Sequence, residues 1–160
     1  MLDREIISAM RFLIDAGDNP RPYYWNIPQD FMVPAIYFPQ PEISARGDTL
    51  RTYAIEFSWF VKFFAKDTQS AHLLGFSALA ALQRMKNVVP LIDDTGALTG
   101  RSFRMRDPAL RTIDDGAVQL TLMWDSPRPY FEEPAQKTMI YHINMYAKSA
   151  FGRAVKQNGG

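Results

Sequence analysis

The feature that most constrains this chain is the stretch of residues 51–64, which reads RTYAIEFSWFVKFF. Its odd-numbered positions form an unbroken apolar row: Tyr53, Ile55, Phe57, Trp59, Val61 and Phe63. Mostly polar residues alternate with them, and a period of two is typical of a β-strand with one buried face. Fully extended, these residues would reach about 46 Å, whereas a compact domain of this size is about 40 Å across. We therefore expect the strand to bend at a bulge or to pair at one end with something outside its own domain.

The polar face of this strand becomes apolar near its end. Phe60 and Phe64 lie there on either side of Lys62. An apolar patch on an outward face is typical of a contact surface. We expect these three residues to lie at an interface with another subunit or with a partner.

Composition narrows the class of protein. The chain has 160 residues with a net charge of +1 and contains no cysteine. These values favour a single cytoplasmic domain and give no support to a generic nucleic-acid binder, a disulfide scaffold or a thiolate metal site. The first ten residues, MLDREIISAM, lack the apolar run of a signal peptide, and no apolar run approaches the length of a membrane span, so we expect neither feature. We expect one domain over residues 1–150 and a flexible tail over residues 151–160.

Two helices are predicted. Residues 2–16 carry an apolar stripe and end at Gly17, and residues 68–86 form a longer helix capped by Asp67 or Thr68. The longer helix has a broad apolar face, which predicts packing on a sheet along most of its length. That face comprises Ala71, Leu73, Leu74, Phe76, Ala78, Leu79, Leu82 and Met85.

Six prolines and several aromatic residues fall within residues 19–41, which predicts an ordered, extended loop. We expect Tyr23, Tyr24 and Trp25 to anchor this loop on its own domain. Alternatively the loop is an arm that docks on a neighbouring subunit, since long loops are uncommon unless they are functional. Residues 32–38 predict a short edge strand within it, and residues 42–49 predict a turn.

The second half of the chain reads mainly as strands. Residues 101–106 and 117–124 alternate, with turns at residues 93–96 and 114–116 and a proline-rich link at residues 126–134. Residues 137–147 fit a strand or a helix. The predicted fold class is α+β: a single domain with an antiparallel β-sheet packed by an N-terminal helix and one long central helix.

Residues that could carry chemistry are few. His72 and His142 have no neighbouring ligands at metal spacing, and the two Asp-Asp pairs are followed by turn glycines. We predict no catalytic residue, no metal, no cofactor and no enzymatic activity. A basic cluster of Arg101, Arg104, Arg106 and Arg111 remains. It fits a solvated strand face, a salt-bridged subunit interface or a phosphate-facing surface, and the low net charge favours the interface over the phosphate.

The order of these elements resembles the tail terminator, or tail-completion, proteins of long-tailed bacteriophages. The resemblance rests on the N-terminal helix, the segment FMVPAIYFP, the strand RTYAIEFSWFVKFF, the helix SAHLLGFSALAALQRM, and then RSFRMR, the DDG turn and VQLTLMW. It implies a structural virion protein that forms a hexameric ring on the head-proximal end of a tail tube. The ring stops tube polymerisation and joins the tail to the head.

The implied partners are further copies of the chain, the tail tube protein, a neck or head-completion protein and the sheath protein. DNA would only pass through the lumen, and no membrane is involved. The implied location is the virion tail, and the host cytoplasm during assembly. Two alternatives stay open: another neck, head-closure or tube component, and a cytoplasmic small-ligand-binding domain with Glu56, His72 and Tyr141 in its pocket.

Overall fold

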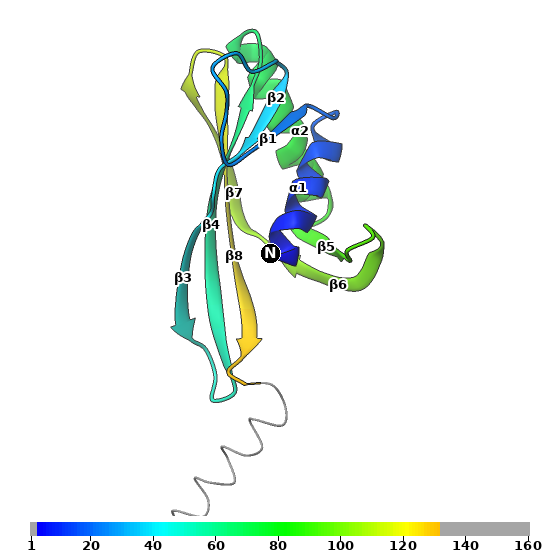
Figure 1. The fold of residues 1–160 in the computed structure, drawn as a ribbon, viewed down its shortest axis with the longest axis vertical. Helices are drawn as coiled ribbons and strands as arrows, with labels where there is room; N and C mark the ends of the chain where they lie inside the picture. The colour runs from blue at the N-terminus through cyan, green and yellow to red at the C-terminus, as the bar shows by residue number, and fades with distance from the viewer. Residues whose placement is uncertain (1–2, 132–160) are drawn as a thin grey trace, which may run out of the picture. The chain divides into compact units, whose positions relative to one another are not determined.

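The computed structural model describes residues 3–131, which form two helices and eight strands (Figure 1). The helices are α1 (Arg4–Ala16) and α2 (Thr68–Arg84). The strands are β1 (Arg21–Tyr24), β2 (Ala35–Phe38), β3 (Glu42–Gly47), β4 (Thr52–Phe64), β5 (Val88–Ile92), β6 (Leu98–Arg104), β7 (Arg106–Asp114) and β8 (Ala117–Pro129).

The chain divides into a larger unit, Met1–Arg46 with Ile55–Ser126, and a smaller one, Gly47–Ala54 with Pro127–Gly160. Within the smaller unit, Tyr53 packs on Tyr130 with their ring centroids 5.5 Å apart. The backbone N–H of Tyr130 donates to the carbonyl of Arg51 at 3.1 Å. The elements discussed below belong to the larger unit except where β4 and β8 continue into the smaller one.

Six strands form one sheet in the order β1-β2-β4-β8-β7, with β3 also paired to β4. The β2–β4 and β7–β8 pairs are antiparallel, and β1 runs parallel to β2. Strands β5 and β6 form a separate antiparallel pair. The predicted α+β class, with an antiparallel sheet packed by two helices, is confirmed.

The core lies on one face of this sheet, which we call the inner face. The odd residues of β4 from Phe57 to Phe63 are buried there, as the period-two pattern predicts, and so are Val118, Leu120, Leu122 and Trp124 of β8. The pattern fails at the start of the strand, where Tyr53 and Ile55 are only half-buried and Ala54 is buried instead. Both helices lie on this side of the sheet (Figure 1). Gly75 of α2 brings the helix close to Leu110 and Val118, since a Cβ at Gly75 would lie 2.6 Å from Leu110 Cδ1.

Helix α1 follows its sequence signals closely. The Asp3 carboxylate caps its start by accepting from the Glu5 N–H at 3.0 Å, and Gly17 closes its end by donating to the Leu13 carbonyl at 3.0 Å. Ile6, Met10 and Leu13 are buried. The predicted N-terminal helix is therefore confirmed.

Helix α2 is also confirmed, with Asp67 as its cap accepting from the Ser70 N–H at 2.7 Å. Its predicted broad buried face is wrong in part. Leu73, Phe76 and Met85 have exposed fractions of 59%, 55% and 46%. The buried face is the narrower set Ala71, Gly75, Ala78 and Leu82, because one side of a straight helix can touch the sheet at a time.

The predicted loop of residues 19–41 contains β1, so β2 is not the edge strand that the sequence predicted. The N–H groups of Arg21 and Trp25 donate to the carbonyls of Pro34 and Phe38, both at 3.0 Å. Alternate residues of a strand point their N–H groups in opposite directions, so the nitrogen of Pro22 faces away from β2. Proline is tolerated at that position because no ladder hydrogen bond is lost.

Three further predictions are corrected. Residues 42–49 were predicted as a turn, but most of them form β3, which pairs with β4 and exposes all six residues. The predicted strand over residues 101–106 ends at Arg104, because Met105 is buried between β6 and β7 and its N–H donates to the Asn87 carbonyl at 2.8 Å. Strand β8 continues to Pro129, into the predicted proline-rich link.

The remaining predictions stand as follows. The turns at residues 93–96 and 114–116 are confirmed. Strand β5 was not predicted. Residues 137–147, His142 and the proposed tail of residues 151–160 lie outside the described residues, so the domain boundary at residue 150 remains a prediction.

Candidate assembly surface

The face of the six-stranded sheet opposite the helices, which we call the outer face, gathers most of the residues predicted at an interface. Trp124 of β8 points to the inner face, so the next residue, Asp125, points to the outer face. On β4 the same alternation places Glu56, Phe60, Lys62 and Phe64 on the outer face, opposite the buried row. This face has an aromatic patch on one part and a group of ion pairs on another.

The aromatic patch is built around the end of β4. The ring centroids of Phe64 and Phe31 are 4.9 Å apart, and Phe31 in turn meets Tyr23 edge-on at 6.2 Å. Lys62 lies over the ring of Tyr37, with its Nζ 5.8 Å from the ring centroid. We define the aromatic patch as Tyr23, Phe31, Tyr37, Phe60, Lys62 and Phe64.

Lys62 is the one cation of the aromatic patch, and it is half-buried. Burial lowers the pKa of its ammonium group, because removal of water penalises the charged form. The Tyr37 ring opposes this effect, since the negative face of an aromatic ring attracts a cation. The side chain thus presents its aliphatic stem among aromatic rings while its ammonium donates to the Phe60 carbonyl at 3.4 Å.

The predicted anchors of the proline-rich segment divide between two roles. Tyr24 stacks on the buried Phe38 with a centroid distance of 5.7 Å and an interplanar angle of 15°. Trp25 packs against the core, and its carbonyl accepts from the Tyr37 hydroxyl at 2.9 Å. Anchoring on the chain's own domain is confirmed for these two residues, whereas Tyr23 joins the aromatic patch.

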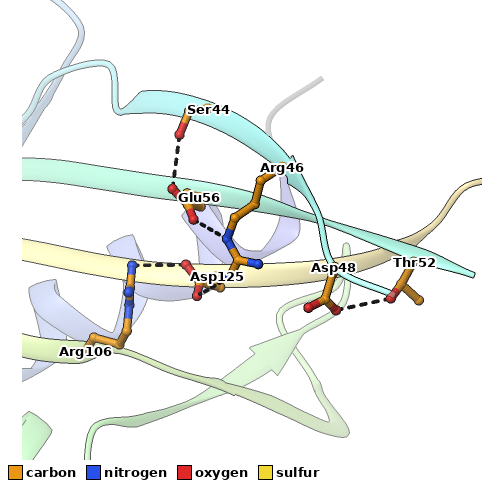
Figure 2. A network of polar contacts seen from close by, with 7 residues as sticks. All are labelled: Ser44, Arg46, Asp48, Thr52, Glu56, Arg106 and Asp125. Carbon is orange, nitrogen blue, oxygen red and sulfur yellow. Dashed lines mark hydrogen bonds and ion pairs between the residues drawn. The ribbon is translucent and has the colours of Figure 1, made fainter. Parts of the chain in front are cut away.

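The second part of the outer face is a charge ladder of four residues from four neighbouring strands, shown in Figure 2. Arg46 of β3 pairs through Nε with Glu56 of β4, and its Nη2 lies 3.3 Å from Oδ2 of Asp125 on β8. Arg106 of β7 follows, with Nη2 3.0 Å from Oδ1 of Asp125. The contacts run from Glu56 to Arg46, Asp125 and Arg106 in turn, and the two arginines and two carboxylates are neutral in sum.

The ladder contacts shift the pKa of Glu56. The hydrogen bond from Arg46 holds the pKa of the Glu56 carboxyl below its usual value, and a weaker bond from the Ser44 hydroxyl adds to this effect. The Asp125 side chain has an exposed fraction of 26%. Exposed ion pairs contribute little free energy individually. The ladder therefore adds little stability, and it leaves this part of the outer face without net charge.

The arginines of the predicted basic strand lie on two different sheets. Arg106 belongs to the ladder on the six-stranded sheet, whereas Arg101 and Arg104 are exposed on β6 of the two-stranded sheet. Sequence reasoning did not find Arg46 or Asp125. Each of the four strands carries more than one charged residue, such as Glu42 beside Arg46 on β3 and Arg128 beside Asp125 on β8, so the sequence does not reveal which charges meet.

The residues proposed for a small-ligand pocket do not form one site. Glu56 lies on the outer face, and His72 lies on α2, which covers the inner face; His72 stacks on Phe76 at 6.5 Å. Tyr141 lies outside the described residues. Within residues 3–131 no group of acidic or histidine side chains has the geometry of a metal site. Neither helix in that range has the length and hydropathy needed to cross a bilayer.

No protein-family model matches the chain. It is 28% identical over 144 residues to the phage-like element PBSX protein XkdJ of Bacillus subtilis, covering 90% of this chain and 97% of XkdJ. It is 32% identical over 117 residues to the uncharacterized protein YqbJ of the same organism, covering 73% of this chain and 79% of YqbJ. The chain belongs to the YqbJ family.

XkdJ is by its name a protein of a phage-like element, so this member of the YqbJ family is related to a phage protein. The resemblance in the sequence predicted a relationship to bacteriophage proteins, and this coarser prediction is confirmed. An alignment that covers 90% of the chain necessarily includes the four strands that carry the charge ladder. The outer face thus belongs to the region that this chain shares with XkdJ.

Proposed function

We propose that this protein is a structural virion subunit that forms a hexameric ring on the head-proximal end of a bacteriophage-type tail tube. The ring stops tube polymerisation and provides the surface that joins the tail to the head. The observation that carries this proposal is the relationship to a phage-element protein, XkdJ, over 97% of its length. The order of helices and strands, which resembles that of tail terminators, supports it.

The chemistry of the outer face fits a protein partner. Aromatic and arginine side chains are enriched in protein–protein interfaces, and the aromatic patch lies on the same face as two arginines. Both arginines are neutralised by carboxylates within the ladder. A surface that grips DNA needs unpaired cations for its phosphates. In the proposed role, DNA is cargo that passes through the ring.

The partners that follow from the proposal are other copies of the chain, the tail tube protein, a neck or head-completion protein and the sheath protein. The subunit acts by contact alone, without catalysis, cofactor or membrane. Its place is the virion tail, after assembly in the host cytoplasm. Interface residues proposed for these contacts are Tyr23, Tyr24, Trp25, Phe60, Lys62, Phe64, Arg101, Arg104 and Arg106.

A second candidate is another neck, head-closure or tail-tube component, and the relationship to XkdJ favours it equally. The two candidates differ in assembly. A terminator closes into one ring by a rotational interface, whereas a tube subunit also stacks without limit.

Native mass spectrometry of the purified protein over a series of concentrations and salt strengths tests the proposal, with negative-stain imaging of the same samples. We expect a species of six times the 18.3 kDa chain mass and annular particles. Filaments of stacked rings would favour a tube subunit. If added tail tubes neither bind the protein nor stop growing at the end where it is supplied, the terminator role is wrong.

A further inference from the structure

Strand β3 has one backbone edge that faces no other strand. Among the described residues it pairs with β4 alone, and all six of its residues are exposed (Figure 1). Such an edge presents unpaired N–H and C=O groups to any further strand. The edge of β1 is blocked by the nitrogen of Pro22, whereas residues 42–47 contain no proline. An open edge of this kind is typical of a surface that accepts another strand.

Side-chain contacts identify which backbone groups of β3 lie on this edge. Ser44 and Arg46 both contact Glu56, so the even residues of β3 lie on the outer face, opposite the even residues of β4. The odd residues of β4 direct their backbone groups to β8, as does the next odd residue, Ala65, whose N–H donates to the Gly116 carbonyl at 3.0 Å. Even residues of β3 and β4 therefore bond to each other, and the odd residues of β3 turn their backbone groups to the open edge.

The two odd residues in the middle of β3 are Ile43 and Ala45, and each offers one N–H and one C=O. A second copy of β3, placed antiparallel about a two-fold axis at Ser44, brings Ile43 of each copy opposite Ala45 of the other. Such a pair exchanges two backbone hydrogen bonds. The two symmetric pairs would thus form four bonds, without disturbing the bonds between β3 and β4.

The side chains of residues 42–46, EISAR, match in this arrangement. Glu42 of each copy lies directly opposite Arg46 of the other on the outer face. Opposite charges at such positions stabilise an antiparallel pair, and like charges destabilise it. A shift of two residues in either direction loses both Glu42–Arg46 pairs. A shift of one residue places outer-face residues opposite residues of the other face.

We propose that β3 of a second copy of this chain adds to the open edge of β3, antiparallel and centred on Ser44. The occupant is a second copy because the strand is complementary to itself in charge and in the face of each side chain. A two-fold contact differs from the head-to-tail contact between neighbours in a ring, so this inference does not rest on the proposed ring. A pairing of four hydrogen bonds is short, so covalent trapping is the suitable test.

The chain contains no cysteine, so an introduced cysteine reports this contact without background. Position 44 of the two copies would form a non-hydrogen-bonded pair with Cα atoms about 4.5 Å apart, within the range of a disulfide. The matched control is Ile43→Cys, on the same strand and 59% exposed in the wild type. Its two copies would lie roughly 9 Å apart, too far to bridge. We expect Ser44→Cys to cross-link under mild oxidation at least about tenfold faster than Ile43→Cys.

A mixture of Ile43→Cys and Ala45→Cys chains gives a second readout that keeps Ser44. These positions would lie opposite each other, so we expect the mixed disulfide to form well beyond its statistical share. All the changed positions are exposed, so the variants should keep their fold, which circular dichroism checks.

A charge change tests the register. Adding Glu42→Arg to the Ser44→Cys chain places like charges opposite each other, so cross-linking at low salt should slow by at least about threefold. The proposal is overturned if Ser44→Cys and Ile43→Cys cross-link at equal rates, or if the mixture shows no preference for the mixed disulfide. An unchanged rate with Glu42→Arg would overturn it as well.

Discussion

The indole N–H of Trp124 donates a hydrogen bond to the Glu5 carboxylate at 2.9 Å, joining β8 to the first turn of α1. The other oxygen of Glu5 accepts from the Ser126 hydroxyl, also at 2.9 Å. Trp124 is fully buried and its rings pack on Phe57 and Trp59. One carboxylate therefore satisfies two polar groups of the inner face and fixes α1 on the sheet.

Replacing this carboxylate should destabilise the fold. We expect Glu5→Ala to lower the free energy of unfolding by about 1–3 kcal/mol, because it leaves a buried indole N–H without an acceptor. Glu42→Ala, at an exposed position on β3, should change it by less than about 0.5 kcal/mol. Urea denaturation of both variants measures the difference. Equal midpoints for the two would mean that Glu5 has no such role.

Gly116, in the turn between β7 and β8, and Gly100, on β6, both have positive φ. Together they offer a matched test of close packing at that turn. Gly116 has φ +69°, and an added Cβ would lie 2.8 Å from the Ala65 carbonyl oxygen, whereas Gly100 has φ +81° and open space around it. We expect Gly100→Ala to cost about 1–2 kcal/mol from backbone strain alone. Gly116→Ala should cost clearly more in thermal or urea unfolding, because a backbone atom must move. Equal losses would contradict the close approach.

The charge ladder makes a pH-dependent contribution to stability. Because Arg46 lowers the pKa of folded Glu56 below its ordinary value of 4.5, ionised Glu56 favours the folded state. That contribution is present above the ordinary pKa and is lost as the pH falls through the lowered pKa of the folded state. We expect Arg46→Met to raise the pKa of Glu56 in NMR titration. It should also reduce the loss of stability between about pH 5 and pH 3.

Arg104→Met is the control for this experiment, since Arg104 is exposed on β6, away from the ladder. It removes the same charge without touching Glu56. If Glu56 titrates at the same midpoint in both variants, the Arg46 contact does not exist in solution.

The aromatic patch predicts where assembly is sensitive. We expect Phe60→Ser to weaken self-association by about tenfold or more, because central aromatic residues dominate many interfaces. Ile43→Ser is the matched control: Ile43 is 59% exposed on β3, and the neighbouring Ser44 and Arg46 contacts place its side chain off the outer face. Native mass spectrometry reports the oligomer, and circular dichroism checks that both variants fold. Wild-type assembly of Phe60→Ser would place the interface elsewhere.

The parts of the fold that could be predicted are those that depend on local pattern. Alternation along β4 identified the buried row from Phe57 to Phe63, and the caps Asp67 and Gly17 located helix ends. The predicted turn at Asp93 forms because its carboxylate accepts from the N–H groups of Thr95 and Ala97 at 2.8 and 3.0 Å. Each of these signals lies within a few residues of the structure that it specifies.

The parts that could not be predicted depend on partners far away in the chain. Strand β3 alternates only briefly, with Ile43 and Ala45 between polar residues, and all six of its residues are exposed; it is a strand because it pairs with β4. Arg46 meets Asp125 across 79 residues. The exposure of Leu73 and Phe76 was missed because periodicity shows that a helix face is apolar but not what covers it. Of the outer face, the sequence identified Phe60, Lys62, Phe64 and Arg106 as interface residues and missed Arg46 and Asp125.

Pro22 sets a limit on how this sheet can grow. Its nitrogen faces outward from β1, at the open side of the sheet, and carries no hydrogen to offer an incoming strand. A foreign strand laid along β1 would leave one of its own carbonyls without a donor at this point, so fibril-like extension by backbone pairing is disfavoured there. In the proposed ring, subunits would meet through their side chains, while this edge of the sheet would not pair with a strand of a neighbour.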